Sequence, residues 1–410
     1  MKILFICHDL PSPFNPATLR VFHSLNLLSK KYKHEITIIA FKELTEEKKY
    51  IFKLNDYCEL ITVSRHNPRT ISLSKKMAYI TMNTLSPHNI FSKNPSFLNY
   101  SYSSKMHRKI KETLRLNKFD VIYVDSYHMM FYVLNENTPK VLEIWDDLNE
   151  FYNLYKNEKK FSHKILSLIE YYKCKYCEKL YTKFDKCITV SSLDKDALKS
   201  RLPNLDISVI PYGVDINYFK PISSKRHNFP NLLFVGTMSY LHNVNAVLYF
   251  YNKVFQLIKK EIPIVKLYIV GRNPPNEITQ LSTLDDSVFV TGYVEDVRPY
   301  YANASVVVVP TTSGAGIKTK VLEAMAMGKP IVSTSTGARG IDIAPEENII
   351  IADDPKEFAR RVIELLGNEK MREKIGANAR KLVEEKYSWE KMTDMLNEVF
   401  EKLVKERKHA

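Results

Sequence analysis

The sequence predicts an α/β protein built from two doubly wound domains. At 410 residues the chain is too long for one ordinary hydrophobic core. Short apolar runs alternate with amphipathic stretches almost from end to end, and this alternation is typical of parallel sheets with crossover helices. All eleven glycines lie at or after Gly213, so the second half alone carries glycine-rich turns.

The first predicted domain covers residues 1–210. Helices are expected at amphipathic stretches such as Ala17–Tyr32 and Lys105–Asn117, and along the longer stretch Glu150–Phe184. Glu170 and Glu178 share one face of that stretch, and we interpret this face as solvated rather than as a catalytic pair. Strands are expected where apolar residues form short runs: Lys2–Cys7, Glu35–Phe41, Cys58–Val63, Asp120–Asp125, Lys140–Ile144 and Asp185–Val190.

The turn-rich segment Ile210–Pro221 marks the boundary with a second domain, residues 211–387. A helix over about 388–410 is expected to pack back on the first domain. Three of the second domain's strands end in glycine, at Gly236, Gly271 and Gly292, and Gly314 follows the fourth. In a parallel sheet these ends line one crevice, where ligands bind. The predicted strands are Asn231–Val235, Val265–Val270, Ser287–Thr291, Ser305–Val309, Pro330–Ser333 and Asn348–Ile351.

The composition is that of a soluble globular protein, with 45% hydrophobic and 26% charged residues. No apolar run reaches the roughly 20 residues that a membrane-spanning helix needs. Lys2–Cys7 lacks the length of a signal peptide, so we expect a cytoplasmic protein. The five scattered cysteines are consistent with a reducing compartment. The Cys174-x-x-Cys177 spacing is interpreted as coincidental, because no second pair accompanies it.

The net charge of +14 is concentrated in the first half of the chain. Between Arg65 and Lys118, eleven basic residues face a single acid, Glu112, with aromatic residues among them. A solvated basic face is the simplest interpretation. The alternative is that the stretch binds an anionic partner, either an anionic glycan or an anionic membrane surface. Membrane attachment would place the protein on the inner face of the cell membrane. No nucleic-acid-binding module accompanies the stretch, so no nucleic-acid partner is expected.

The run Gly314-Ala-Gly-Ile-Lys-Thr-Lys-Val-Leu-Glu323 carries the densest chemistry. It lies between a predicted strand and a helix, where free backbone amides and a helix N-terminus receive phosphate. The two lysines add positive charge, and the glutamate suits the hydroxyls of a ribose. The alternative, a surface ion pair between Lys320 and Glu323, leaves both glycines unexplained.

Two further turns add weaker signals. Phe234-Val-Gly-Thr237 places a hydroxyl and free amides where a phosphate could lie. Thr291–Asp296 could offer an aromatic face and backbone groups to a nucleobase. Taken alone, however, this turn favours the alternative, in which Tyr293 and Val294 pack in the core and Asp296 caps a helix over Val297–Asn303.

These motifs follow one another in a characteristic order: Phe234–Tyr240, Tyr268–Arg272, Val290–Val297 and Val309–Thr334. The order and spacing resemble the GT-B glycosyltransferases of family four. Ile210–Pro221 is similar to that family's interdomain segment. The loop Pro11–Pro16 and Arg20 resemble the beginning of the family's acceptor-side domain. The resemblance implies two Rossmann-like domains facing each other across a cleft. It also implies transfer of a sugar from a nucleotide diphosphate with retention of anomeric configuration.

Carried over residue by residue, the resemblance places Glu323 on the ribose, Val294 on the base and Gly236-Thr237 against the diphosphate. No metal or other cofactor is expected, because positive side chains and a helix N-terminus can stabilise the leaving group. Lys318 and Lys320 are the candidates for that role. The full predicted nucleotide-sugar site comprises Gly236, Thr237, Gly271, Arg272, Tyr293, Val294, Gly314, Gly316, Ile317, Val321 and Glu323.

The chain departs from the family's usual pattern in two ways. Ala315 stands where the first of two glutamates usually lies, so only the second, Glu323, is present. Many members also carry Arg and Lys after the strand that corresponds to Phe234–Gly236, whereas this chain has Thr237 and then His242-Asn243. The phosphate-binding role is therefore assigned to Lys318 and Lys320.

On the acceptor side, Asp146 and Asp147 follow a predicted strand and are the candidate catalytic carboxylates. A helix cap or a loop charge is the alternative. His8 and Arg20 complete the predicted acceptor side, although a lone histidine after a strand is more often structural.

The predicted activity is sugar transfer to a glycan or lipid-linked acceptor in cell-surface polysaccharide synthesis. Two alternatives remain open at this stage. One is a GT-B sugar-nucleotide epimerase, and the other is a catalytically degenerate module that binds a partner or a membrane.

Overall fold

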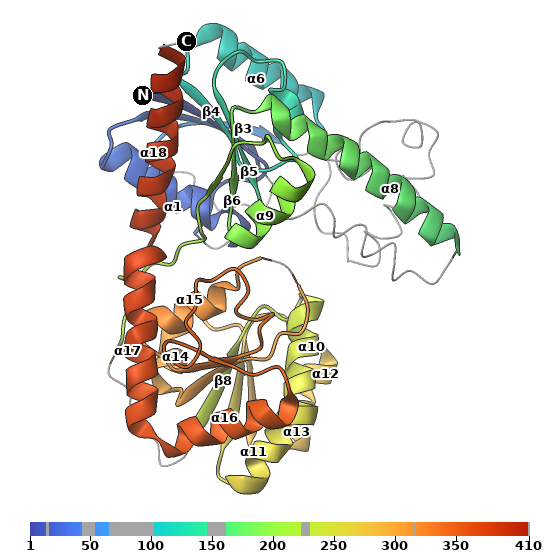
Figure 1. Cartoon of the computed structure of the whole chain (residues 1–410), viewed down its shortest axis with the longest axis vertical. Helices are drawn as coiled ribbons and strands as arrows, with labels where there is room; N and C mark the ends of the chain where they lie inside the picture. The colour runs from blue at the N-terminus through green and yellow to red at the C-terminus, as the bar shows by residue number, and fades with distance from the viewer. Residues whose placement is uncertain are drawn as a thin grey trace. The chain divides into compact units, whose positions relative to one another are not determined.

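The computed structural model describes residues 1–13, 16–42, 54–64, 102–145, 161–222, 230–314 and 316–408. The chain divides into two compact units (Figure 1). Unit 1 comprises Met1–Ile210 with Thr393–Ala410, and unit 2 comprises Pro211–Met392. Each unit contains one wholly parallel sheet with helices along its connections, so the predicted α/β fold class is confirmed.

The described residues of unit 1 form a sheet of seven strands in the order β3-β2-β1-β4-β5-β6-β7. The central strand β1 is buried at five of its six residues, because a parallel strand is covered on both faces. All six predicted strands exist, each within two residues of its expected ends. The sequence missed β7, a three-residue strand. The bounds are β1 Lys2–Cys7, β2 Glu35–Lys42, β3 Glu59–Ser64, β4 Val121–Val124, β5 Lys140–Ile144, β6 Lys186–Thr189 and β7 Ile207–Val209.

Among the described residues of unit 1, the α-helices are α1 Pro16–Lys30, α6 Ser104–Leu116, α8 Phe161–Lys179, α9 Ser192–Arg201 and the part of α18 (Trp389–Lys408) that begins at Thr393. This C-terminal part of α18 packs on the first strands of the chain. Asp394 accepts hydrogen bonds from Lys31 and Tyr32, both at 2.7 Å. The Phe400 ring lies edge-on to Phe5, with 6.3 Å between the ring centroids.

The sheet of unit 2 has six strands in the order β10-β9-β8-β11-β12-β13. Neighbouring residues of one strand enter different cores, because side chains alternate across a sheet. Leu232 and Phe234 belong to one cluster and Leu233 to the other. The bounds are β8 Asn231–Val235, β9 Lys266–Val270, β10 Val288–Gly292, β11 Val306–Val309, β12 Ile331–Ser333 and β13 Ile350–Ile351.

The helices that matter for the site are α10 (Leu241–Tyr249), α14 (Arg298–Asn303) and α15 (Thr319–Ala326). Further helices cover the sheet: α11 Gln256–Glu261, α12 Asn276–Thr279, α13 Leu281–Leu284, α16 Pro355–Gly367 and α17 Glu369–Lys386. A π-helical turn, Phe250–Phe255, joins α10 to α11.

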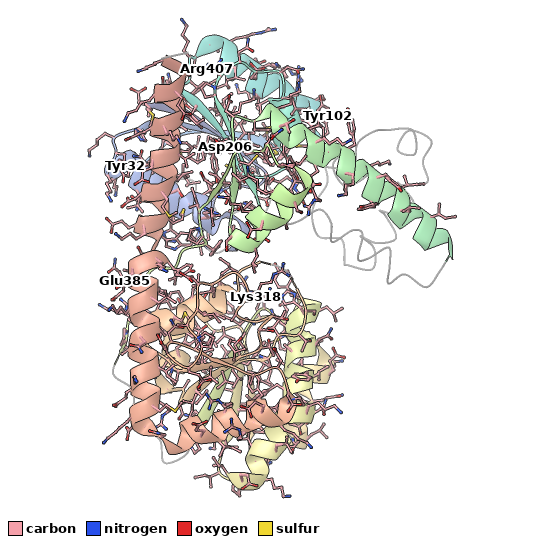
Figure 2. The ribbon with its side chains drawn as sticks, viewed as in Figure 1. Tyr32, Tyr102, Asp206, Lys318, Glu385 and Arg407 are labelled. Carbon is pink, nitrogen blue, oxygen red and sulfur yellow. The ribbon has the colours of Figure 1, made fainter. Side chains whose placement is uncertain are left out.

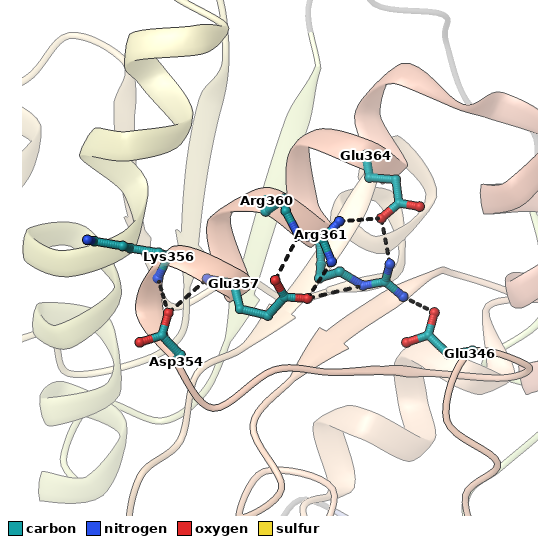
Figure 3. Close-up of polar contacts among 7 residues, drawn as sticks. All are labelled: Glu346, Asp354, Lys356, Glu357, Arg360, Arg361 and Glu364. Carbon is teal, nitrogen blue, oxygen red and sulfur yellow. Dashed lines mark hydrogen bonds and ion pairs between the residues drawn. The ribbon is translucent and has the colours of Figure 1, made fainter.

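Helix α16 is fixed by a cap and a charge network on its surface (Figure 3). Asp354 accepts from the backbone N–H groups of residues 356 and 357, which satisfies two donors at the helix start. Arg361 pairs with Glu364 on the same helix and with Glu346 in the preceding turn. The network ties α16 to the connection that leads into β13.

Both sheets reverse their strand order at one point, between β1 and β4 in unit 1 and between β8 and β11 in unit 2. In open parallel sheets, ligands bind at the carboxyl ends of the strands on either side of such a reversal. A ligand of unit 2 is therefore expected at the ends of β8 and β11. A ligand of unit 1 is expected at the ends of β1 and β4.

Candidate functional site

Three glycines bring the strand ends of unit 2 close together. Gly236 donates its N–H to Val270 O at 2.9 Å, and Gly271 donates to Gly292 O at 3.1 Å. A Cβ on Gly271 would lie 1.8 Å from Gly236 O, so no larger residue fits there without moving the turn. The close approach leaves a surface of bare backbone at the end of β8.

Lys320 reaches this surface from the first turn of α15. Its Nζ donates to Asn243 Oδ1 at 2.8 Å and lies 4.1 Å from the centroid of the Phe234 ring. A Cβ on Gly236 would lie 2.8 Å from the same Nζ, so the ammonium lies directly against the glycine turn. Burial, together with the positive charge of Lys318, lowers the pKa of Lys320 to about 7.

Lys318, labelled in Figure 2, stabilises the loop that leads into α15. Its Nζ donates to Gly314 O and to Gly316 O, both at 3.1 Å. Both glycines have positive φ, +103° and +71°, a conformation that favours glycine. Lys318 therefore holds the loop in shape and brings a second positive charge to it. Ala315 lies outside the described residues.

Glu323 lies one turn further along α15. Its Oε2 accepts a hydrogen bond from the Tyr301 hydroxyl of α14 at 2.9 Å. Burial raises the pKa of this carboxyl group. Lys320 and Glu323 thus take different partners, and the alternative of a surface ion pair between them is wrong. The sequence did not predict Tyr301 as the residue that orients Glu323.

The remaining predicted donor residues differ in exposure. Arg272 lies with its guanidinium 5.6 Å from the centroid of the Tyr293 ring. That ring is 68% exposed, so the alternative that packs Tyr293 in the core is wrong. Val321 is fully buried, so its side chain belongs to the core and only its backbone could face a ligand. The backbone oxygen of Thr237 accepts from Asn243 Nδ2 at 2.9 Å. Val294 and Ile317 are partly buried.

The helix-cap alternative for Asp296 holds in part, because α14 begins at Arg298 and Val297 is its N-cap residue, so that Asp296 lies one position earlier. It accepts from the backbone N–H of Arg298 at 2.9 Å and pairs with the same guanidinium, which fixes the start of α14. The ion pair lowers the pKa of Asp296.

In unit 1, polar side chains also gather at the strand-order reversal. The backbone N–H of His8, just after β1, donates to Asp125 Oδ1, just after β4, at 3.0 Å. His8 Nδ1 lies 3.4 Å from Asp9 Oδ1. The centroids of the His8 and His128 rings are 4.9 Å apart. The sequence predicted His8 at this position but not His128. Asp146 and Asp147 lie outside the described residues.

Arg20 is buried within unit 1, where it pairs with Glu143. It is 3% exposed, and its Nη1 lies 2.5 Å from Glu143 Oε1. Its Nη2 donates to Ile210 O at 2.8 Å, and Glu143 also accepts from the Tyr123 hydroxyl. Arg20 therefore joins α1, β5 and the end of unit 1 rather than presenting its charge at the surface of that unit.

Part of the basic stretch 65–118 is described, from Tyr102 onward. There α6 buries Met106 and Ile110, while Lys109 pairs with Glu112. The residues 65–101 lie outside the described part. Within the described ranges, no helix is long and apolar enough to cross a membrane. The same ranges contain no group of three or more His, Cys, Asp or Glu residues placed to hold a metal ion.

Two family models match the chain over most of its length. The model "Glycosyltransferase Family 4" matches residues 31–218, and "Glycosyl transferases group 1" matches residues 229–368. The chain belongs to the glycosyltransferases of family four.

Solved structures show that this glycosyltransferase has the GT-B fold. It is similar to sucrose-phosphate synthase from Thermosynechococcus elongatus, with a TM-score of 0.68 and 16% identity over 98% of this chain and 99% of that one. It is also similar to Anabaena Alr3699/HepE in complex with UDP-glucose, with a TM-score of 0.65 and 15% identity over 98% of this chain and 100% of that one.

Two relatives in sequence have names that refer to a cps region or to capsular polysaccharide biosynthesis. An uncharacterized 44.6 kDa protein in the cps region of Klebsiella pneumoniae is 26% identical over 95% of this glycosyltransferase and 97% of its own length. The capsular polysaccharide biosynthesis glycosyltransferase CapM of Staphylococcus aureus is 32% identical, over 35% of this chain and 40% of its own.

Proposed function

We propose that this glycosyltransferase moves a sugar, with retention and without a metal, from a nucleotide diphosphate to a glycan or lipid-linked acceptor in cell-surface polysaccharide synthesis. The observation that carries the proposal is the convergence of Lys318 and Lys320 on the glycine turns at the ends of β8 and β11. Positive groups at that point can stabilise the charge that develops on a leaving diphosphate. Bare backbone beside them lets phosphate oxygens approach closely.

The donor is proposed to bind unit 2, with Glu323 on the ribose and the turn at Gly292–Val294 under the base. Tyr301 holds the Glu323 carboxylate in place by its hydrogen bond. UDP-glucose is the first donor to test, because the structurally similar HepE is described in complex with it. The capsule context of the Klebsiella and Staphylococcus relatives supports a polysaccharide or lipid-linked acceptor.

For the chemical step we propose a substitution on one face of the sugar, in which the leaving diphosphate helps to take the proton of the acceptor hydroxyl. Asp146 or Asp147 is proposed to orient that hydroxyl. The basic residues of 65–118 are proposed to hold the protein at an anionic membrane where a lipid-linked acceptor is presented.

The experiment is a thermal-shift screen of UDP-, GDP- and ADP-sugars followed by a transfer assay with chelator present. At 100 times its dissociation constant a ligand stabilises the protein by about 2.7 kcal/mol. Lys318→Ala with Lys320→Ala should then reduce turnover by at least about 100-fold. Lys253→Ala, which removes an exposed lysine of the π-helical turn, is the matched control. Intact turnover in the double variant would contradict the proposed role of the lysines.

A further inference from the structure

The donor region of unit 2 contains a titratable side chain to which the motifs assign no role, His242. It is the second residue of α10 and is half-buried. A Cβ on Gly314 would lie 3.7 Å from His242 Cγ and 3.6 Å from Lys318 Nζ. The imidazole and the ammonium therefore both lie close to the glycine loop at Gly314.

The start of α10 is held in place on both sides of His242. The His242 ring stacks on the Tyr240 ring, with 5.6 Å between the ring centroids and an angle of 19° between the ring planes. The next residue, Asn243, accepts from Lys320 Nζ and donates to Thr237 O. The imidazole is thus fixed beside the same turn that Lys320 contacts, unlike a histidine on a mobile surface.

The charges around His242 favour an anion. Lys318 and Lys320 face it from the loop and from α15, while the nearest carboxylate on α15, Glu323, is hydrogen-bonded to Tyr301 of α14. Among the described residues, no carboxylate forms an ion pair with His242. Burial and the two lysines lower the pKa of the imidazole, so the ring is neutral near pH 7.

We propose that His242 contacts the diphosphate of the donor and takes up a proton as the diphosphate binds. This inference rests on the proposed donor site. A diphosphate at the glycine turn places negative charge beside the ring and reverses the local field. The proton comes from the buffer, the imidazole becomes a cation with two N–H donors, and one of them donates to a phosphate oxygen. His242 thereby supplies the cation that the chain lacks just after β8.

The test is calorimetry of UDP-glucose binding at about pH 7 in two buffers of different ionisation enthalpy. UDP-glucose is a suitable probe because its substituted diphosphate does not titrate near neutral pH. The difference in observed enthalpy gives the number of protons taken up. The wild-type protein should take up protons on binding, and His242→Gln should lower that number measurably. Affinity of His242→Gln should fall about tenfold at pH 6 and change little at pH 8.5.

Controls separate this proposal from the proposed function. Lys253→Gln removes an exposed positive charge on the helix that continues α10 and should leave proton uptake unchanged. His242→Asn, with the same measurement, checks that the glutamine side chain itself causes no artefact. The histidine Hε1 resonance that is lost in His242→Gln should move on titration of the wild-type protein with UDP-glucose.

The outcomes are distinct. Binding with the same proton uptake in wild type and both His242 variants would refute the role of His242 and leave the donor site standing. Failure of UDP-, GDP- and ADP-glucose to bind the wild-type protein would refute the donor site and His242 with it.

Discussion

Replacing Lys320 by methionine should stabilise unit 2 in mild acid while weakening donor binding. The lysine is buried, and its ammonium bonds to a neutral amide, Asn243, rather than to a carboxylate. Methionine has a similar length, carries no charge, and packs well on an aromatic ring such as Phe234. The variant therefore removes the charge with little change in volume.

The magnitude follows from the pKa of Lys320, which falls from 10.5 to about 7 on folding. At about 1.4 kcal/mol per pKa unit, keeping the buried group charged costs about 5 kcal/mol at pH values below 7. Losing the donor to Asn243 Oδ1 costs about 1–3 kcal/mol in the variant. The net expectation is a stabilisation of about 2–4 kcal/mol at pH 6.5.

The sign of the pH dependence gives an independent check. Between pH 7 and 10.5 the unfolded chain binds more protons at Lys320 than the folded chain does, so wild-type stability gains from this group as pH rises. The variant lacks that gain. Its advantage should therefore shrink with rising pH and change sign near pH 9, where the remaining cost of deprotonating Lys320 on folding, about 2 kcal/mol, equals the cost of the lost hydrogen bond.

The assay is urea denaturation followed by tryptophan fluorescence in a Trp145→Phe background, where Trp389 reports on unit 2. UDP-glucose affinity, measured in parallel by calorimetry, should fall about 100-fold, as expected for loss of a buried charged contact. A variant that is less stable than wild type at pH 6.5 and still binds the donor normally would refute the reasoning.

Three further substitutions test other parts of the structure. Gly271→Ala should abolish donor binding and lower the melting temperature of unit 2, because its Cβ would lie 1.8 Å from Gly236 O; scanning calorimetry with and without UDP-glucose tests both effects. Arg20→Met should destabilise unit 1 by about 3–5 kcal/mol by leaving Glu143 buried without its cation, and adding Glu143→Gln should restore part of the loss in urea denaturation. Tyr301→Phe should weaken donor binding about fivefold and stability by about 1 kcal/mol, measured by calorimetry and thermal unfolding, because the carboxylate of α15 loses its donor.

Much of the fold could be predicted because the buried strands of a parallel sheet are easy to recognise in a sequence. A strand buried on both faces must be apolar throughout, and in unit 2 glycine follows or ends each of the three strands β8, β9 and β10. Strand β7 was missed because three residues, Ile207–Val209, carry no periodic signal and run directly into the turn-rich boundary. Its stability comes from pairing with β6, which is a tertiary contact.

Helical spacing predicted which residues share a face but not whether that face is covered. Glu170 and Glu178 do lie on one side of α8, yet both are buried, so the solvated interpretation is wrong. Glu170 pairs with Lys173, and Glu178 pairs with Arg201 of α9. In a stretch where lysines and aromatics alternate, either face can become the buried one. The choice depends on a partner helix that lies some 20 residues away in the sequence.

For the donor site, too, the sequence predicted which residues come together but not which side chains contact each other. The topological rule brought Gly236, Gly314 and the two lysines to one crevice, because strand ends on either side of a reversal must meet. Nothing in the sequence indicated that Asn243 would bond to Lys320, or that Tyr301 would hold Glu323. Both contacts join residues far apart in the chain and depend on how three helices are angled on the sheet.

These contacts explain how a site that departs from the family's usual motif can still receive a diphosphate. Lys320 is positioned by a neutral amide, so its charge is not already neutralised by a carboxylate partner. Burial and the positive charge of Lys318 both disfavour protonation of Lys320 and His242, and the negative charge of a bound diphosphate offsets part of that penalty. The electrostatic strain that lowers the stability of the protein alone then contributes to the affinity for the donor. Donor binding should consequently strengthen as pH falls through the range in which Lys320 and His242 take up protons.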